Sequence, residues 1–224
     1  MSDSEYGEEE NEAEYFGEYE GERNEAGERH GLGNASKGKR SALRLALHDD
    51  VVNSVDVSYI NQSLASSSLQ YDMLASGSND CTLKLWDVRE RKYSASFKVG
   101  YQITSVAFNH GNSIIFFGGI DNTIRGINLR KHQIEYHLIG HSDTVASISL
   151  SPSGNYLLSN GMDNTVRIWD VKPFTTNESR EEKVLLGATH NFEKNLLKCC
   201  WSGDEKLVSA GSADRTVNVW DVET

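Results

Sequence analysis

Short apolar runs alternate with turn residues at intervals of about ten residues from His48 to the end of the chain, a spacing typical of an all-β array. Residues 141–189 contain four such runs, VASISLS (145–151), YLLSN (156–160), TVRIWDV (165–171) and KVLLG (183–187). Between the first two runs, Pro152 and Gly154 favour a tight reversal, because proline presets its φ and glycine tolerates a positive φ. The pattern therefore predicts four consecutive strands.

This unit recurs along the chain. The copies run DMLASGSNDCTLKLWDV (72–88), SIIFFGGIDNTIRGINL (113–129), YLLSNGMDNTVRIWDV (156–171) and KLVSAGSADRTVNVWDV (206–222). Their landmarks Asp80, Asp121, Asp163 and Asp214 are 41, 42 and 51 residues apart. A period of about 40–45 residues is that of a WD repeat, in which each copy forms one propeller blade. We therefore predict an all-β WD40 β-propeller with about four blades.

Charge divides the chain into two parts. Of its 33 acidic residues, 12 lie in residues 1–30 beside two basic ones, so this segment carries −10 of the total charge of −11. Such a segment, with few aliphatic side chains, cannot offset the conformational entropy lost on folding. We predict a disordered acidic tail and linker over residues 1–45, followed by WD40 repeats over residues 46–224. The repeats are expected at about 46–99, 100–140, 141–189 and 190–224, the last of them incomplete.

Histidine, serine and aspartate occur together in the third copy, and the same residue types make up a hydrolase triad. An active site occurs once, whereas most of this set recurs at the same offsets in other copies. Recurrence favours buried hydrogen-bond networks that tie the strands together, because buried polar groups need partners. The residues predicted for these networks are His141, Ser159, Asp163 and Trp169 in the third copy, Ser76, Asp80 and Trp86 in the first, and His190, Asp214 and Trp220 in the fourth, where Ala210 replaces the serine.

The sequence does not indicate other chemistry. It contains no zinc-protease motif, phosphate-binding loop or CxxC pair. The repeat region is nearly neutral, which disfavours direct nucleic-acid binding. The sequence has no apolar run long enough to predict a membrane span, and the acidic start of the chain is unlike a secretory signal. We therefore expect an intracellular, non-enzymatic binding platform with no metal, cofactor, membrane or small-molecule ligand.

Two stretches carry features that a generic WD repeat does not need, namely YLLSNGMDNTVRIWDVKPF (156–174) and HNFEKNLL (190–197). Together with the rest of residues 51–222, they resemble the WD-repeat family of the spliceosomal U5 small nuclear ribonucleoprotein (snRNP). The resemblance implies a nuclear, non-catalytic scaffold in pre-mRNA splicing. It also implies partners: the large central scaffold protein of the spliceosome and other U5 snRNP proteins, with RNA bound only indirectly.

By the same resemblance, loops on the propeller rim would contact the partner. The nominated residues are Lys172, Pro173 and Phe174 after the third WD strand, and Asn191, Phe192, Glu193, Lys194 and Asn195 before the fourth copy. Phe192 either anchors an interface or packs beneath its own loop. Members of the family look seven-bladed, so we expect this chain to be a partial copy of an incomplete propeller.

An alternative function rests on a short motif. Trp86, Asp87 and Arg89 match the WDxR box of substrate receptors of cullin-type ubiquitin ligases. The same residues also fit an ordinary strand end followed by a solvated loop. A splicing scaffold and a ligase receptor are therefore two hypotheses that their partners would distinguish.

Overall fold

The computed structural model describes residues 48–57, 73–87, 92–191 and 193–223, and these residues contain fifteen strands and no helix. Sheet 1 consists of β1 (Val52–Val57), β2 (Met73–Ser78), β3 (Thr82–Asp87) and β4 (Lys92–Lys98). Sheet 2 consists of β5 (Ile103–Phe108), β6 (Ile114–Gly119), β7 (Ile124–Asn128) and β8 (Gln133–Leu138). Sheet 3 consists of β9 (Val145–Leu150), β10 (Tyr156–Gly161), β11 (Thr165–Asp170) and β12 (Glu181–Leu186). Sheet 4 consists of β13 (Cys199–Trp201), β14 (Leu207–Gly211) and β15 (Val217–Asp221).

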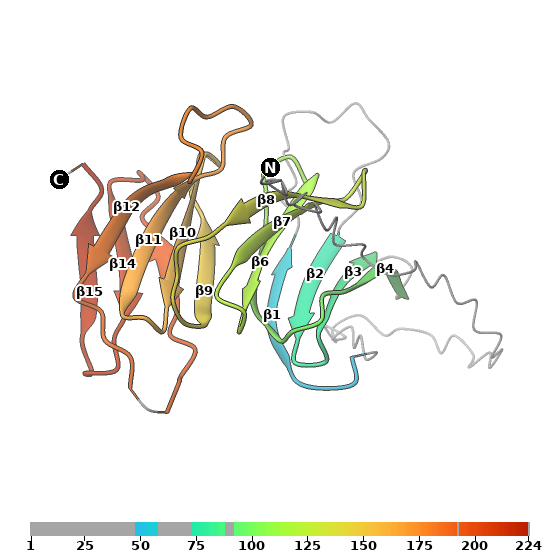
Figure 1. Cartoon of the computed structure of the whole chain (residues 1–224), viewed down its shortest axis with the longest axis horizontal. Helices are drawn as coiled ribbons and strands as arrows, with labels where there is room; N and C mark the ends of the chain where they lie inside the picture. Colours follow the sequence, from blue (N-terminus) through green and yellow to red (C-terminus); the bar gives the residue numbers. More distant parts are fainter. Residues whose placement is uncertain (1–47, 58–72, 88–91, 192, 224) are drawn as a thin grey trace, which may run out of the picture.

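The sheets stand side by side in chain order, each with its strands antiparallel and in sequence order (Figure 1). The first strands of consecutive sheets are neighbours, so β5 lies between β1 and β9, and β13 follows β9. A serine hydroxyl accepts a backbone N–H across each junction: Ser54 from Val106 at 3.2 Å. Ser105 accepts in the same way from Ile148 at 3.0 Å. Four-stranded sheets stacked in this way are propeller blades, so the prediction of an all-β propeller with about four blades is confirmed.

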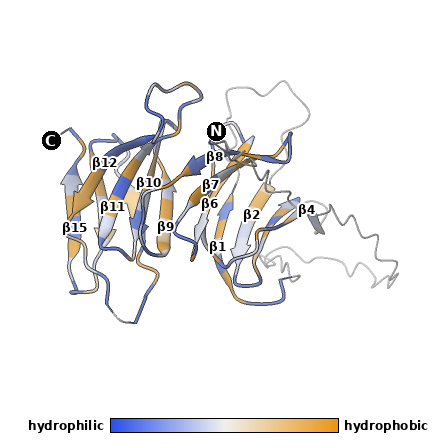
Figure 2. Cartoon of the chain, viewed as in Figure 1, coloured by the Kyte–Doolittle hydropathy of each residue, from blue (hydrophilic) through white to orange (hydrophobic). Residues whose placement is uncertain are grey.

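Apolar side chains fill the space between consecutive sheets. Figure 2 shows that the hydrophobic residues concentrate on the strands, whereas the connections are mostly hydrophilic. Large residues buried between sheets 1 and 2 include Leu83, Ile103 and Phe117. Those between sheets 2 and 3 include Phe116, Leu157 and Trp169. Those between sheets 3 and 4 include Leu158, Val166 and Ile168. Each such side chain contributes about 1.5–3 kcal/mol through burial, so every sheet depends on its neighbours.

The landmark aspartate begins the same backbone turn in every repeat. The residue after it has a positive φ each time: 65° at Cys81, 66° at Asn122, 62° at Asn164 and 71° at Arg215. This left-handed conformation is unfavourable for most side chains. In the first, third and fourth repeats the aspartate stabilises the turn by accepting the N–H two residues later, from Thr82, Thr165 and Thr216. The repeated motif of the sequence is thus a repeated turn between the second and third strands.

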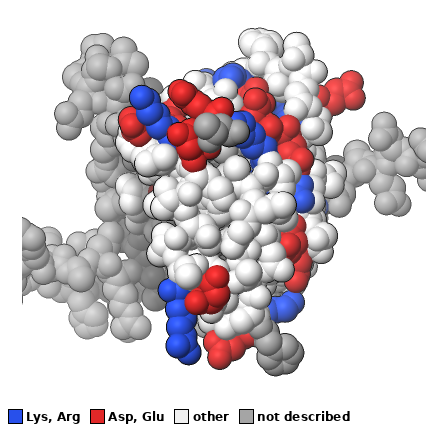
Figure 3. Space-filling model, turned by 90° about the vertical axis from the view of Figure 1, so that its left-hand side faces the viewer, with Lys and Arg blue, Asp and Glu red and all other residues white. Residues whose placement is uncertain are grey.

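Sheet 4 differs from the other sheets at the edge of the described structure. It has three strands, and β15 pairs with β14 alone among the described residues. The face of sheet 4 that points away from sheet 3 is broad and uncharged at its centre, with charged residues around the rim (Figure 3). The acidic tail predicted for residues 1–45 lies outside the described residues.

Candidate functional site

In the third repeat, four buried side chains form one continuous chain of hydrogen bonds. The indole N–H of Trp169 donates to Ser159 Oγ at 2.8 Å, and Ser159 Oγ lies 2.7 Å from His141 Nε2. His141 Nδ1 lies 3.0 Å from Asp163 Oδ2. Every group is satisfied if Ser159 donates to Nε2 and the histidine is neutral with its proton on Nδ1, facing the carboxylate. These hydrogen bonds link the loop before β9 to strands β10 and β11.

The first repeat has the same network. Trp86 Nε1 donates to Ser76 Oγ at 2.7 Å, and His48 bridges Ser76 and Asp80 with two contacts of 2.7 Å. Sequence reasoning missed His48, although HDDVV (48–52) parallels HSDTV (141–145) at this point of the third repeat. That parallel is the signal that could have found it.

This geometry clamps strands together and does not present a nucleophile. Ser159 is fully buried, and its hydroxyl oxygen is already occupied by Trp169 and His141. A substrate carbonyl would have to reach that oxygen, as it does in a serine hydrolase. The Ser, His and Asp residues of these networks therefore serve to hold the fold together.

The carboxylates in these networks are held in their charged form. Burial by itself raises the pKa of Asp80, but hydrogen bonds from Thr82, His48 and backbone N–H groups outweigh it and lower the pKa to about 2. The pKa of Asp163 is lowered further below its usual value, since bonds from His141 and Thr165 again outweigh the effect of burial. A lowered pKa in the folded state means that each carboxylate stabilises the fold above its unfolded pKa of about 3.9.

Acid should therefore remove this stabilisation as the pH falls from about 4 towards the folded-state values. We expect Asp163→Asn to be less stable than the wild type at pH 6, and the difference to shrink at about pH 2.5, because the unfolded wild type then takes up a proton. Urea unfolding at the two pH values measures this. If the wild type and Asp163→Asn differ in stability by the same amount at both pH values, the pKa of Asp163 is not lowered in the folded state.

The second repeat replaces the network by packing and an ion pair. Phe117 and Ile127 stand at the serine and tryptophan positions, and both are buried against sheet 1. Arg125 donates to Asp121 and, at 2.5 Å, to the hydroxyl of Tyr101, which takes the place of the histidine. In this repeat the arginine therefore links the loop before β5, the turn between β6 and β7, and β7 itself, without a histidine.

The fourth repeat requires a correction, because the structure does not join His190, Asp214 and Trp220 in a network. His190 Nε2 lies 3.1 Å from Asn160 Oδ1, and Trp220 Nε1 donates to the carbonyl of Leu186 at 3.0 Å. Both contacts lead to sheet 3. Asp214 accepts from Thr216. The physical reason is Ala210, which has no hydroxyl to connect the histidine to the tryptophan.

The nominated contact residues lie on two separate surfaces. Residues 172–174 belong to the connection from β11 to β12, and residues 191–195 to the connection from β12 to β13. Successive connections of an antiparallel sheet lie at opposite ends of its strands, and Figure 1 shows the two loops at the top and the bottom of sheet 3. One flat partner surface cannot cover both loops.

The 172–174 loop presents an aromatic side chain on a fixed base. Phe174 is 93% exposed. Lys172 Nζ donates to the Tyr156 hydroxyl at 2.9 Å and lies 4.5 Å from the centre of that ring. Arg180 donates to the Lys172 carbonyl at 2.9 Å. Pro173 follows with its fixed φ, so the base of the loop is ordered and its tip is open to a partner.

In the 191–195 loop, polar groups pair with one another. Asn191 and Asn195 donate to Glu193 at 3.5 and 3.0 Å, and Lys194 lies 3.7 Å from Asp143 of sheet 3. The prediction for Phe192 falls on a residue outside the described ones. This loop therefore ties sheet 4 to sheet 3.

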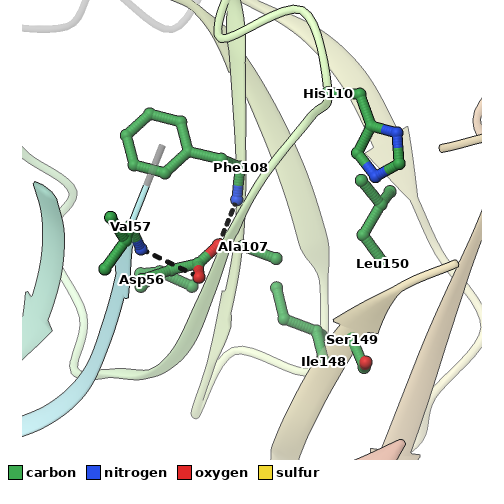
Figure 4. Close-up of a pocket in the computed structure, with 9 residues that line it drawn as sticks. Asp56, Val57, Ala107, Phe108, His110, Ile148, Ser149 and Leu150 are labelled. Carbon is green, nitrogen blue, oxygen red and sulfur yellow. Dashed lines mark hydrogen bonds between the residues drawn. The ribbon is translucent and has the colours of Figure 1, made fainter. Parts of the chain in front are cut away.

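A hollow of about 260 Å³ opens where the first strands of sheets 1, 2 and 3 end (Figure 4). It is lined by Asp56, Val57, Val106, Ala107, Phe108, His110, Ile148, Ser149 and Leu150. The Asp56 carboxylate accepts the N–H groups of Phe108 and Val57 at 2.7 and 2.9 Å. Its charge is thus used in joining β1 to β5.

The described residues show little that would support other chemistry. Trp86 of the WDxR motif is 3% exposed and belongs to the network of the first repeat, whereas Arg89 lies outside the described residues. Burial raises the pKa of the Cys199 thiol to about 12, so it stays protonated. In the described part of the chain, no His, Cys, Asp and Glu side chains cluster as a metal site would require. The same residues include no helix of the length and hydrophobicity needed to cross a bilayer.

Comparison with known proteins gives relatives that cover part of the chain. The U5 small nuclear ribonucleoprotein 40 kDa proteins of Pongo abelii and Homo sapiens are each 50% identical over 149 residues, which are 66% of this chain and 42% of either protein. The pre-mRNA-splicing factor cwf17 of Schizosaccharomyces pombe is 40% identical over 173 residues, 77% of this chain and 48% of that protein. The chain therefore spans less than half the length of these relatives.

A family model described as WD domain, G-beta repeat matches residues 40–87, 132–170 and 185–221. The second repeat, in which Phe117 and Ile127 replace serine and tryptophan, falls largely outside the matched ranges. The matched residues make up more than half of the chain and contain β1 to β3, β8 to β11 and β13 to β15. On this match and on its blade architecture, the chain belongs to the WD40 repeat family.

Proposed function

We propose that this chain is a non-catalytic WD-repeat component of the U5 snRNP, which acts in pre-mRNA splicing in the nucleus through protein contacts. The observation that carries the proposal is the 50% identity over 149 residues to U5 snRNP 40 kDa proteins. Its partners are the large central scaffold protein of the spliceosome and other U5 snRNP proteins. RNA joins the assembly through these proteins.

The described side chains favour binding over catalysis. The hydroxyl of Ser159 and the thiol of Cys199 are the buried candidate nucleophiles, and both are held in a form that cannot attack a substrate: one is fully hydrogen-bonded, and the other stays protonated. What the fold presents to other molecules is its loops. This distribution supports a scaffold.

The partner contact is assigned to the 172–174 loop, with Phe174 as its anchor. Exposed aromatic residues supply large contact areas at interface centres. Because the base of this loop is already fixed by Tyr156 and Arg180, little conformational entropy remains to be lost on binding.

Phe174→Ala is expected to weaken binding to purified U5 snRNP about tenfold or more, since truncation of an aromatic anchor commonly costs about 2 kcal/mol or more. Ile139→Ala is the matched control, because Ile139 is also exposed, at 71%, and lies in a connection at the opposite end of the strands. Binding of both variants can be measured with a fluorescent label on the chain. Equal binding by Phe174→Ala and the wild type would remove the loop from the interface.

A further inference from the structure

The connection between the third and fourth strands of sheet 3 is longer than its counterpart in sheet 2. It spans residues 171–180, whereas sheet 2 makes the same connection with residues 129–132. Sheet 3 has four strands and lies between sheets 2 and 4, and the connection projects from its top in Figure 1. A blade closes with the shorter connection, so the additional residues are not needed to build one.

The additional residues include an exposed serine in acidic surroundings. Ser179 follows Glu178 and is itself followed by Glu181 and Glu182. Ser179 and Glu182 are both exposed. Acidophilic protein kinases select a serine by a carboxylate three residues after it, since basic residues of the kinase bind that charge. Ser179 and Glu182 have this spacing.

Of the other serine and threonine residues in the described part of the chain, two have an acidic residue at the same spacing. Thr175 precedes Glu178 by three residues, but it is half-buried and accepts the N–H of Asn177 at 3.3 Å. Ser202 is half-buried in the short connection from β13 to β14, where it donates to Asp204 at 2.6 Å and accepts a backbone N–H at 3.0 Å. A kinase has to draw the serine into its own active site, which local opening of a long connection permits. Exposure and loop length therefore favour Ser179.

We propose that Ser179 is a phosphorylation site for an acidophilic serine kinase. In the reaction the γ-phosphoryl group of ATP moves to Ser179 Oγ: the bond from Pγ to the bridging oxygen breaks, an Oγ–Pγ bond forms, and ADP leaves. The hydroxyl proton goes to the catalytic aspartate of the kinase. The phosphoserine carries up to about two negative charges at neutral pH.

The phosphate acts on the 172–174 loop through the neighbouring Arg180. The guanidinium of Arg180 donates to the carbonyls of Asp170 and Lys172 at 3.2 and 2.9 Å, and these bonds hold the base of the loop. A phosphate dianion on Ser179 is a stronger acceptor than a neutral carbonyl, so it competes for the guanidinium. Phosphorylation therefore loosens the base of the loop.

The consequence for binding rests on the proposed function, in which this loop contacts the U5 snRNP. A loop whose base is no longer fixed has to be ordered when the partner binds, and this ordering lowers the affinity. Phosphorylation of Ser179 should thus weaken the contact made by Phe174.

The first test is incubation of the full chain with a purified acidophilic serine kinase and Mg–ATP, followed by mapping of the phosphate by mass spectrometry. We expect phosphate on Ser179, and Glu182→Gln should lower the initial rate at this residue at least about fivefold. Ser202→Ala is the matched control and should leave the rate at Ser179 unchanged. No phosphate on Ser179, or phosphate on Thr175 in its place, would overturn the proposal.

Hydrogen exchange tests the effect on the loop without any partner. The amides of residues 174–177 should exchange several-fold faster in the phosphorylated chain than in the untreated one. Arg180→Ala should have the same effect without phosphate, and phosphorylation should add little to it. Unchanged exchange after phosphorylation would contradict the coupling through Arg180.

Binding to purified U5 snRNP then separates this regulation from the proposed function. The kinase-treated chain should bind about three- to tenfold more weakly than the untreated chain. Kinase-treated Ser179→Ala is the control for phosphate on other residues and should bind as the untreated chain does. Equal binding by the treated and untreated wild type would contradict the regulation, whereas no binding by the untreated wild type would contradict the proposed function and leave the two preceding tests to decide on the site.

Discussion

Trp169→Ala is expected to lower the free energy of unfolding by about 3–5 kcal/mol, a large fraction of the stability of a domain of this size. Trp169 is fully buried between sheets 2 and 3. Its removal leaves a large cavity and also takes a donor from Ser159, whose hydroxyl then loses one of its two partners. Urea unfolding followed by far-ultraviolet circular dichroism measures the loss.

The matched control is Trp220→Ala, at the same position of the fourth repeat. Trp220 is half-buried, and its indole N–H donates to the carbonyl of Leu186 and not to a serine. Trp220→Ala should therefore lower the free energy of unfolding by less than half as much as Trp169→Ala does. Equal losses at the two sites would show that the third-repeat network adds nothing to the stability of its blade.

Asp163→Ala has the second largest expected effect, about 3 kcal/mol, because it removes a buried carboxylate that is the partner of the buried His141 ring. The Asp163 carboxylate receives bonds from the Ser142 N–H, the Thr165 N–H and the Thr165 hydroxyl, and it faces the His141 ring. Without it, the buried His141 ring and the half-buried Thr165 lose their anionic partner, whereas the exposed Ser142 N–H can bond to water. Hydrogen exchange at Ser142 and Thr165 should accelerate, and the urea midpoint should fall.

Asp214→Ala provides the control, since Asp214 begins the same turn but is exposed. Its side chain bonds to Thr216 and Ser212, which belong to the same turn. The loss of stability should be much smaller, because water can replace the carboxylate. If the two substitutions lower the free energy of unfolding by the same amount, the histidine network adds nothing to the stability that the aspartate turn provides.

Much of the fold could be predicted from local signals. The aspartate turn, with a left-handed residue behind it, recurs once in every blade, so the spacing of the aspartates along the sequence is enough to mark the blades. The networks were predicted less completely. His48 is 28 residues from Ser76, whereas His141 is 18 residues from Ser159, and this longer connection concealed the equivalence.

Comparison of the repeats with one another could not predict the contacts between sheets. Alignment put His190 with Asp214, but without a serine hydroxyl at Ala210 the imidazole bonds to Asn160 of the neighbouring sheet. The two nominated loops are close along the chain, but the sequence alone does not place them relative to one another. One strand, β12, separates them and takes them to opposite ends of the blade.

The most direct test of the proposed function is the capture of small nuclear RNAs with the tagged chain from a nuclear extract, followed by quantification of each RNA. The U5 small nuclear RNA should be enriched over the other spliceosomal RNAs, together with U5 snRNP proteins, and Ile139→Ala should capture as much as the wild type. Capture of a cullin adaptor without U5 RNA would instead support the ligase-receptor hypothesis. No enrichment of U5 RNA over the other RNAs would contradict the assignment of this chain to the U5 snRNP.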